Sequence, residues 1–165
     1  MSDYLAAYPF YSHNDRWFRY LRDIVLGPKA YQDTMMRMLA HHNYELSTAT
    51  SRLWMSERQV LSLHAQGHVI GMHSFSHPTR MSKMDRAKQT KEYRRNKEHL
   101  CKILGLKRIM AMSHPCGNYN TDTLSILHEL EVEIGFNSSM ADVPERGLLE
   151  IPREDPANIL IQMKT

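Results

Sequence analysis

The sequence predicts an α/β fold built from parallel strand–helix units. Stretches with helical periodicity alternate along the chain with short apolar stretches that are typical of strands. Two of the helical stretches end at glycines, Gly67 and Gly105, and an apolar stretch follows each of them closely. The 165 residues, of which 42% are hydrophobic and 24% are charged, are typical of one globular domain spanning residues 1–165.

The N-terminal third predicts one strand and two helices. Residues 4–8, Tyr-Leu-Ala-Ala-Tyr, form a short apolar strand. Asn14 or Asp15 caps a helix that runs to about Leu26, and a second helix follows at residues 29–42. The first helix gathers five apolar side chains on one face: Trp17, Phe18, Leu21, Ile24 and Val25.

The remaining elements alternate more regularly. Ser56 opens a helix that runs to Ala65, because Gln59 completes a capping box three residues later. A strand at residues 68–72 then leads into a loop, and a long helix is expected at residues 82–104. The last expected elements are strands at 108–112, 133–136 and 148–151 and a helix at 121–130.

Charge and composition exclude several classes of function. The formal net charge is +3, and the Lys and Arg residues concentrate between Arg80 and Arg108, which is typical of a solvated helix face. Because no aromatic residues interleave with them in the pattern of single-strand binders, we expect no nucleic-acid partner. No apolar stretch is long enough to cross a bilayer, and the N-terminus lacks signal-peptide features, so we expect a cytoplasmic protein without a membrane partner.

A pair of histidines is the first candidate site. His73 and His77 lie four residues apart, directly after the expected strand at 68–72. Sites in parallel α/β folds assemble at the carboxyl ends of strands, and two imidazoles at this spacing can share one metal ion. The neighbours His41 and His42 are expected to point apart on their helix and to have a surface role.

The stretch around this pair resembles a known motif. Gly67-His-Val-Ile-Gly-Met-His-Ser-Phe-Ser-His-Pro78 is similar to the metal motif of the polysaccharide deacetylases, the NodB homology domains of carbohydrate esterase family four. The resemblance implies that His73 and His77 bind a divalent metal, with zinc the first candidate. It also implies that Ser74 is the hydroxyl residue between the two ligands.

The resemblance extends downstream and covers roughly residues 4–155. Ser113-His-Pro-Cys-Gly-Asn-Tyr119 is similar to the family's Arg-x-Pro-aromatic-Gly motif, with serine in place of arginine and cysteine in place of the aromatic residue. The match implies that Pro115 and Tyr119 contact substrate. From its position beside Pro115, His114 is expected to contact the loop or the substrate, and an approach to His73 or His77 stays open. It further implies that the backbone N–H of Cys116 donates to the oxyanion of the reaction.

The resemblance also implies a fold and indicates which family motifs are absent from the sequence. We expect a distorted, incomplete (β/α) barrel without the first βα unit, which carries the family's Asp-Asp motif, and without its C-terminal histidine motif. No Asp-Asp occurs in the chain, and Asp142 and Asp155 are the carboxylates considered as replacements. The strand at residues 4–8 would then expose an edge through which the chain forms homo-oligomers.

Three functions remain open from the sequence. The first is a metal-dependent hydrolase, impaired in this chain, that removes acetyl groups from N-acetylated sugars or related small amides. The second is a catalytically inactive domain of the same fold that binds a glycan or a protein. The third is a chain without a stable fold. Whether the chain is an enzyme therefore stays open, because the Asp-Asp motif is absent.

Overall fold

The computed structural model describes residues 3–6, 8, 10–140, 147–154 and 156–163. The chain forms two compact units, Met1–Trp54 and Met55–Thr165, and each is described by itself. That the chain is one deacetylase domain stays a prediction.

The N-terminal unit is helical. Helix α1 spans His13–Tyr20, a π-helix continues it over Leu21–Leu26, and α2 and α3 span Gly27–His41 and Leu46–Leu53. The cap of α1 is Ser12 rather than Asn14 or Asp15, because the Ser12 hydroxyl accepts a hydrogen bond from the Asp15 N–H and the Asp15 carboxylate accepts one from the Ser12 N–H. Helix α3 was not expected from the sequence.

The strand expected at residues 4–8 is wrong for the residues that the structure describes. Residues 3–6 form a turn in which Leu5 has a φ of +56°, a value incompatible with an extended strand. Tyr4 packs edge-on against Tyr20 with ring centroids 5.5 Å apart, and its hydroxyl donates to Asp23 at 2.8 Å. The described residues therefore offer no strand edge here for homo-oligomer formation.

The C-terminal unit contains a small parallel sheet. Strand β1, Ala111–Ser113, pairs with β2, Ile134–Phe136, so that Met112 lies opposite Gly135. Single bridges extend the sheet on both sides, from Met72 to Met112 and from Phe136 to Ile151. The strands expected at 68–72 and 148–151 are thus reduced to one bridge each. The α/β class is confirmed, whereas closure into a barrel stays a prediction.

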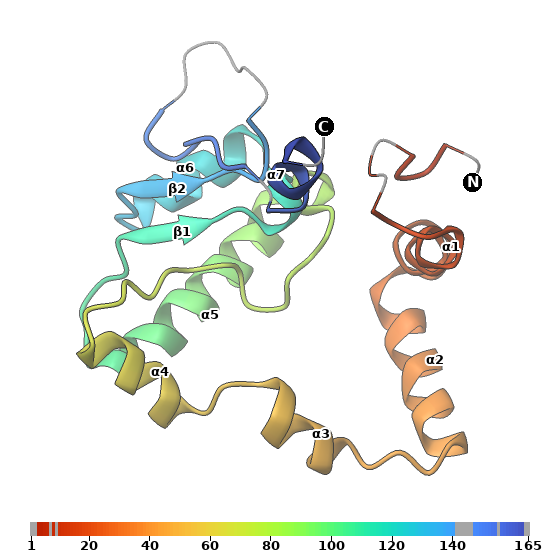
Figure 1. Cartoon of the computed structure of the whole chain (residues 1–165). Coiled ribbons are helices and arrows are strands. Elements are labelled where there is room, and N and C mark those ends of the chain that lie inside the picture. Colours follow the sequence, from red (N-terminus) through yellow and green to blue (C-terminus); the bar gives the residue numbers. More distant parts are fainter. Residues whose placement is uncertain (1–2, 7, 9, 141–146, 155, 164–165) are drawn as a thin grey trace. The chain divides into compact units, whose positions relative to one another are not determined.

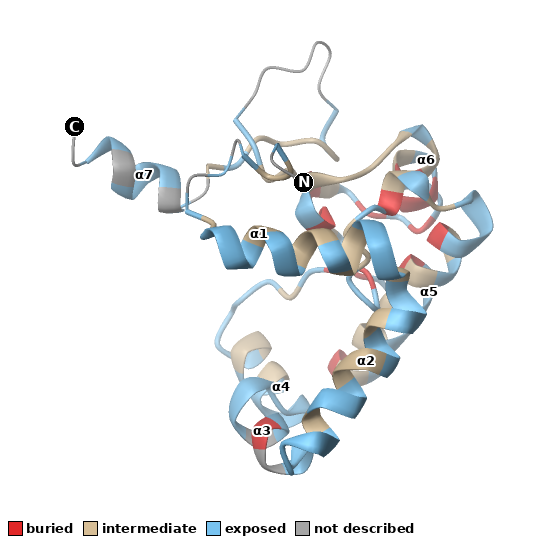
Figure 2. Ribbon diagram, turned by 90° about the vertical axis from the view of Figure 1, so that its right-hand side faces the viewer, coloured by how far each residue is buried: buried red, intermediate tan, exposed pale blue. Residues whose placement is uncertain are grey.

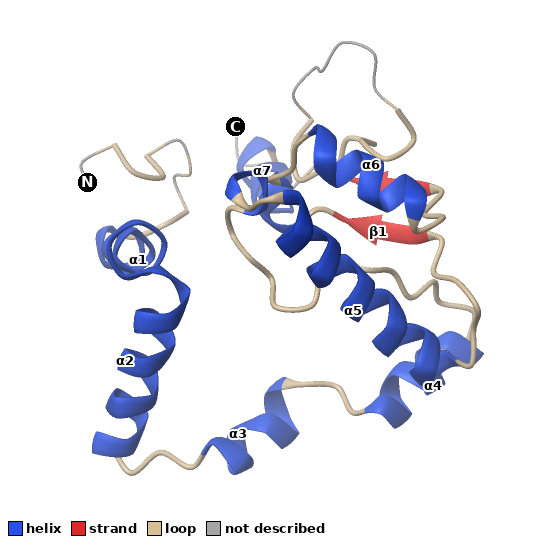
Figure 3. Cartoon of the chain, turned by 180° about the vertical axis from the view of Figure 1, so that it is seen from behind, coloured by secondary structure: helices blue, strands red, loops and turns tan. Residues whose placement is uncertain are grey.

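Helices cover one face of this sheet. Figures 1 and 3 view the chain from opposite sides and place α5, Arg86–Leu104, and α6, Thr121–Glu129, on the same side of β1 and β2. The unit also contains α4, Glu57–Ala65, and α7, Pro156–Gln162. Within the described part of the chain, no helix has both the length and the apolar character needed to cross a bilayer.

Two helix ends follow the sequence signals, and one does not. Ser56 and Gln59 form the expected capping box at the start of α4. Helix α5 ends at Gly105, whose φ of +67° and ψ of 23° are left-handed. However, α5 begins at Arg86 rather than near Ser82, because Asp85 caps it by accepting from the Lys88 N–H.

The core lies between the sheet and its covering helices. Figure 2 shows buried residues gathered in the C-terminal unit, and Ala49 is the described core residue of the N-terminal unit. The core contains three of the twelve methionines, so filling the interior explains only part of the methionine content. Its members are Met72, Met81, Tyr93, Leu104, Ile109, Met112, Ile126, Leu127, Leu130 and Val132.

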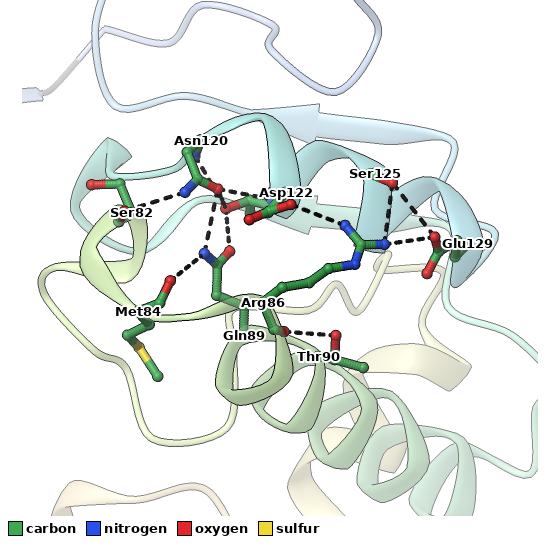
Figure 4. Close-up of polar contacts among 10 residues, drawn as sticks. Ser82, Met84, Arg86, Gln89, Thr90, Asn120, Asp122, Ser125 and Glu129 are labelled. Atoms are coloured by element: carbon green, nitrogen blue, oxygen red, sulfur yellow. Dashed lines mark hydrogen bonds and ion pairs between the residues drawn. The ribbon is translucent and has the colours of Figure 1, made fainter.

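A polar network joins α5 to α6 next to this core (Figure 4). Gln89 is fully buried, donates to the Met84 carbonyl at 3.0 Å and accepts from the Thr123 hydroxyl at 2.6 Å. At the surface, Arg86 pairs with Asp122 at 3.2 Å and with Glu129 at 2.7 Å. Because buried polar groups are costly when unpaired, the inner contacts specify how these helices pack.

Candidate metal centre

The structure brings the two predicted ligands together. His73 directly follows Met72, whose N–H donates to the Ala111 carbonyl and whose carbonyl accepts from the Ser113 N–H, each at 2.9 Å. The loop then turns back so that the ring centroids of His73 and His77 lie 4.8 Å apart, in an edge-to-face arrangement. Both residues are exposed.

A backbone carbonyl orients the first of these rings. Nδ1 of His73 lies 2.7 Å from the carbonyl oxygen of Ser113. Because a carbonyl oxygen only accepts, Nδ1 carries the proton and the lone pair of the neutral ring lies on Nε2. Metal-binding histidines commonly use this arrangement, in which the second nitrogen donates to a carbonyl.

The residues present fit part of a metal site. Two imidazoles suit zinc or a similar cation. Across residues 3–140 and 147–163, with positions 7, 9 and 155 left aside, no group of three or more His, Cys, Asp or Glu side chains could hold a metal ion. Asp142 and Asp155, the carboxylates considered as replacements, lie outside the described residues.

The loop that carries the pair has an unusual backbone. Ser74 and His77 have φ values of +61° and +55°, in the left-handed region that non-glycine residues seldom adopt. The Ser74 side chain is almost fully buried, and its hydroxyl accepts from the N–H of His77 at 3.1 Å. Ser74 therefore fixes the loop between the two histidines, consistent with its place in the motif.

Two residues that hold the loop of the histidine pair were missed by the sequence reasoning. Asn96 Oδ1 accepts from the His73 N–H at 2.9 Å, and Glu92 Oε2 accepts from the N–H groups of Phe75 and Ser76 at 3.1 and 2.7 Å. Both side chains belong to α5. Their spacing of four residues was a weak signal, because it shows only that they share a helix face.

The predicted substrate residues lie mostly inside the protein. His114 is 1% exposed, stacks on Tyr119 at 4.2 Å and donates from Nε2 to the Leu149 carbonyl at 2.8 Å. Burial lowers the pKa of His114, because the charged imidazolium loses its hydration. Pro115 is also buried, and the half-buried Tyr119 donates its hydroxyl to Glu150 at 2.9 Å. That these three residues bind substrate stays a prediction.

Cys116 lies in a tight turn at the surface. Residues Pro115–Gly117 form one turn of 3₁₀-helix in which Cys116 is exposed and has a φ of +53°. Gly117 follows with a φ of +60°, and a Cβ there would collide with the Ser138 hydroxyl. The turn thus requires glycine at this position, and the role of the Cys116 N–H as an oxyanion donor stays a prediction.

Known structures resemble this chain. PplD, a deacetylase of Streptococcus pyogenes solved in complex with acetate, matches with a TM-score of 0.56 and 25% identity over 67% of this chain and 51% of its own. IcaB of Ammonifex degensii matches with a TM-score of 0.53 and 22% identity over 62% of this chain and 49% of its own.

A third match is the BpsB deacetylase domain of Bordetella bronchiseptica, with a TM-score of 0.53 and 18% identity over 61% of this chain and 48% of its own. The chain thus spans about half the length of these structures, with coverage of 51%, 49% and 48%. A comparison with curated proteins found no match. The family model described as polysaccharide deacetylase matches residues 26–135, which is well over half of the chain, and the chain therefore belongs to the polysaccharide deacetylase family.

Proposed function

We propose that the chain contributes to a metal-dependent hydrolase that removes acetyl groups from N-acetylated sugars or related small amides. In this proposal His73 and His77 bind a divalent cation, with zinc the first candidate. Family membership supports the reaction class. The observation that carries the site is the pair of rings 4.8 Å apart, one of them held by the Ser113 carbonyl.

The proposed chemistry divides between the cation and the chain. A divalent cation held by His73 and His77 would supply a Lewis acid for the acetyl carbonyl and would lower the pKa of a bound water. His73 presents Nε2 to the site, because its Nδ1 is taken by the Ser113 carbonyl. We expect the backbone N–H of Cys116, in the turn at Pro115–Gly117, to donate to the oxygen on which negative charge develops.

The acetyl group is the proposed common feature of the substrates. PplD, which this chain resembles at 25% identity, was solved with acetate, the product that such a hydrolysis releases. The sugar or amide that carries the acetyl group is set by loops around the site, so a carbohydrate and a small amide are both candidate substrates.

Calorimetric titration with zinc tests the metal site. The unaltered chain should bind zinc, and the His73→Ala and His77→Ala variants should lose that binding. His42→Ala is the matched control, because the rings of His41 and His42 also lie close together, at 5.2 Å. Zinc binding that is lost in His42→Ala but kept in His77→Ala would refute the proposed site.

Acetate release tests the reaction. We expect this chain alone to release little acetate from N-acetylglucosamine oligomers or small amides, because the described residues supply two imidazoles and no third ligand. The family resemblance implies that the general base belongs to the absent Asp-Asp motif and the general acid to the absent C-terminal histidine motif. Because general acid–base assistance contributes roughly 10²–10⁴-fold, its loss should be severe even with metal bound. Zinc binding without any turnover, even after an N-terminal segment with the family's Asp-Asp strand is added, would favour the alternative, an inactive domain that binds a glycan or a protein. Turnover that His73→Ala abolishes would establish the enzyme.

A further inference from the structure

One face of α5 lies against the loop that carries the two histidines. Arg95 and Asn96 lie three and four residues after Glu92, and His99 lies three residues after Asn96, so the four side chains share one face of the helix. Each of them contacts the loop at residues 73–76. The proposed chemistry uses none of these four side chains directly, so it does not explain why all four contact the same loop.

Two of these side chains hold the loop backbone. The Glu92 carboxylate accepts from two successive N–H groups, those of Phe75 at 3.1 Å and Ser76 at 2.7 Å. Asn96 accepts from the N–H of His73 at 2.9 Å. Hydrogen bonds to a carboxylate are about twice as strong as those between neutral groups, which makes Glu92 the stronger anchor.

The loop needs such anchors because its backbone is strained. Ser74 and His77 are both left-handed, with φ values of +61° and +55°, and neither is a glycine. Residues in this region persist only where their surroundings hold them. Side chains accept the N–H groups of four loop residues: His73, Phe75, Ser76 and His77.

The other two side chains hold Phe75. The guanidinium carbon of Arg95 lies 3.8 Å from the centre of the Phe75 ring, which is a cation–π contact. The ring of His99 meets the same phenyl ring edge-on, with centroids 6.3 Å apart. Phe75 is 42% exposed, so these contacts orient it at the surface rather than bury it.

We infer that Glu92 and Asn96 are positioning residues of the metal site: through the loop backbone they set the separation and direction of the His73 and His77 rings. This inference rests on the proposed function, because it gives the ring pair a metal to hold. Asn96 holds the backbone N–H of His73, and Glu92 holds the N–H groups of the two residues that precede His77. The pairing of α5 with this loop thus prepares the site before a metal arrives.

Substitutions on α5 test the inference. Glu92→Ala and Asn96→Leu remove the acceptors, whereas Glu92→Gln and Asn96→Asp keep an oxygen in place. Glu98→Ala is the matched control, because Glu98 is exposed on the same helix.

Two quantities are measured: the exchange rates of the Phe75, Ser76 and His73 amides in the metal-free chain by NMR, and zinc affinity by calorimetry. Thermal midpoints check that each variant folds, which we expect because the contacts of Gln89 and Arg86 that join α5 to α6 do not involve Glu92 or Asn96.

Glu92→Ala should speed exchange at Phe75 and Ser76 by about tenfold or more, because two charged hydrogen bonds are lost. Zinc affinity should fall about 10–100-fold, the usual effect of removing an outer-shell partner. Asn96→Leu should act at His73 in the same way, and Asn96→Asp should restore most of the affinity. Unchanged affinity in both removal variants, or an equal loss in Glu98→Ala, would overturn the inference. An unaltered chain that binds no zinc would instead refute the proposed function, and with it the role of both residues.

Discussion

Nδ1 of His73 and the carbonyl oxygen of Ser113 lie 2.7 Å apart, and this contact ties the candidate ligand to the end of β1. It leads to a prediction about the proton on the ring. In the metal-free chain, we expect the neutral form of the His73 ring to carry its proton on Nδ1. Long-range proton–nitrogen NMR spectra distinguish the two tautomers. A ring protonated on Nε2 would show that the contact with Ser113 does not persist in solution.

The buried amide of Gln89 should contribute to stability. Gln89→Ala removes the acceptor of the Thr123 hydroxyl and the donor to the Met84 carbonyl. Because buried polar groups are left unpaired, the free energy of unfolding should fall by about 2 kcal/mol. Urea denaturation measures the change, with Lys91→Ala as a control at an exposed position of the same helix. Equal stability of the two variants would contradict the role given to the network.

Gly135 should not tolerate a side chain. A Cβ at this position of β2 would lie 2.6 Å from the carbonyl oxygen of Leu149, which is backbone and cannot rotate away. We expect Gly135→Ala to lower the free energy of unfolding by about 1–3 kcal/mol. Gly147→Ala is the control, because its nearest neighbour, a Glu150 oxygen, would be 3.9 Å away. If chemical denaturation finds Gly135→Ala as stable as the control, the sheet must pair differently at Leu149.

His114 should make stability depend on pH. Burial lowers the pKa of His114 in the folded chain below the ordinary value of 6.5. As the pH falls, His114 therefore binds a proton in the unfolded chain before it does so in the folded chain. The stability lost through His114 should therefore grow as the pH falls below 6.5 toward the folded pKa, and vanish above 6.5.

Denaturation midpoints of the unaltered chain and of His114→Gln between pH 5 and pH 8 check this sign. The variant should lose less stability on acidification, because glutamine does not titrate. A variant whose acid sensitivity equals that of the unaltered chain would mean that His114 is not desolvated in solution.

Local signals in the sequence predicted the elements whose contacts are local. Ser56 and Gln59 lie within one helical turn, and Gly105 needs no partner to adopt its left-handed φ, so both helix ends follow from residue type and spacing. The same holds for the HxxxH spacing, which brings the rings of His73 and His77 together across one turn of backbone. The alternation of helices with apolar stretches likewise predicted the α/β class.

Contacts between distant segments decided the rest. The sequence of residues 4–8 predicts a strand, but no strand of the described residues pairs with it. A turn at Leu5 and the hydrogen bond from Tyr4 to Asp23 form there instead. Glu92 and Asn96 hold loop residues that lie 16 to 23 positions away, a separation that no local pattern encodes. Spacing along the chain therefore identified the two histidines, whereas only the packing of α5 against their loop revealed Glu92 and Asn96. Hydrogen bonds to a distant backbone depend on the fold and leave no periodic signal in the sequence.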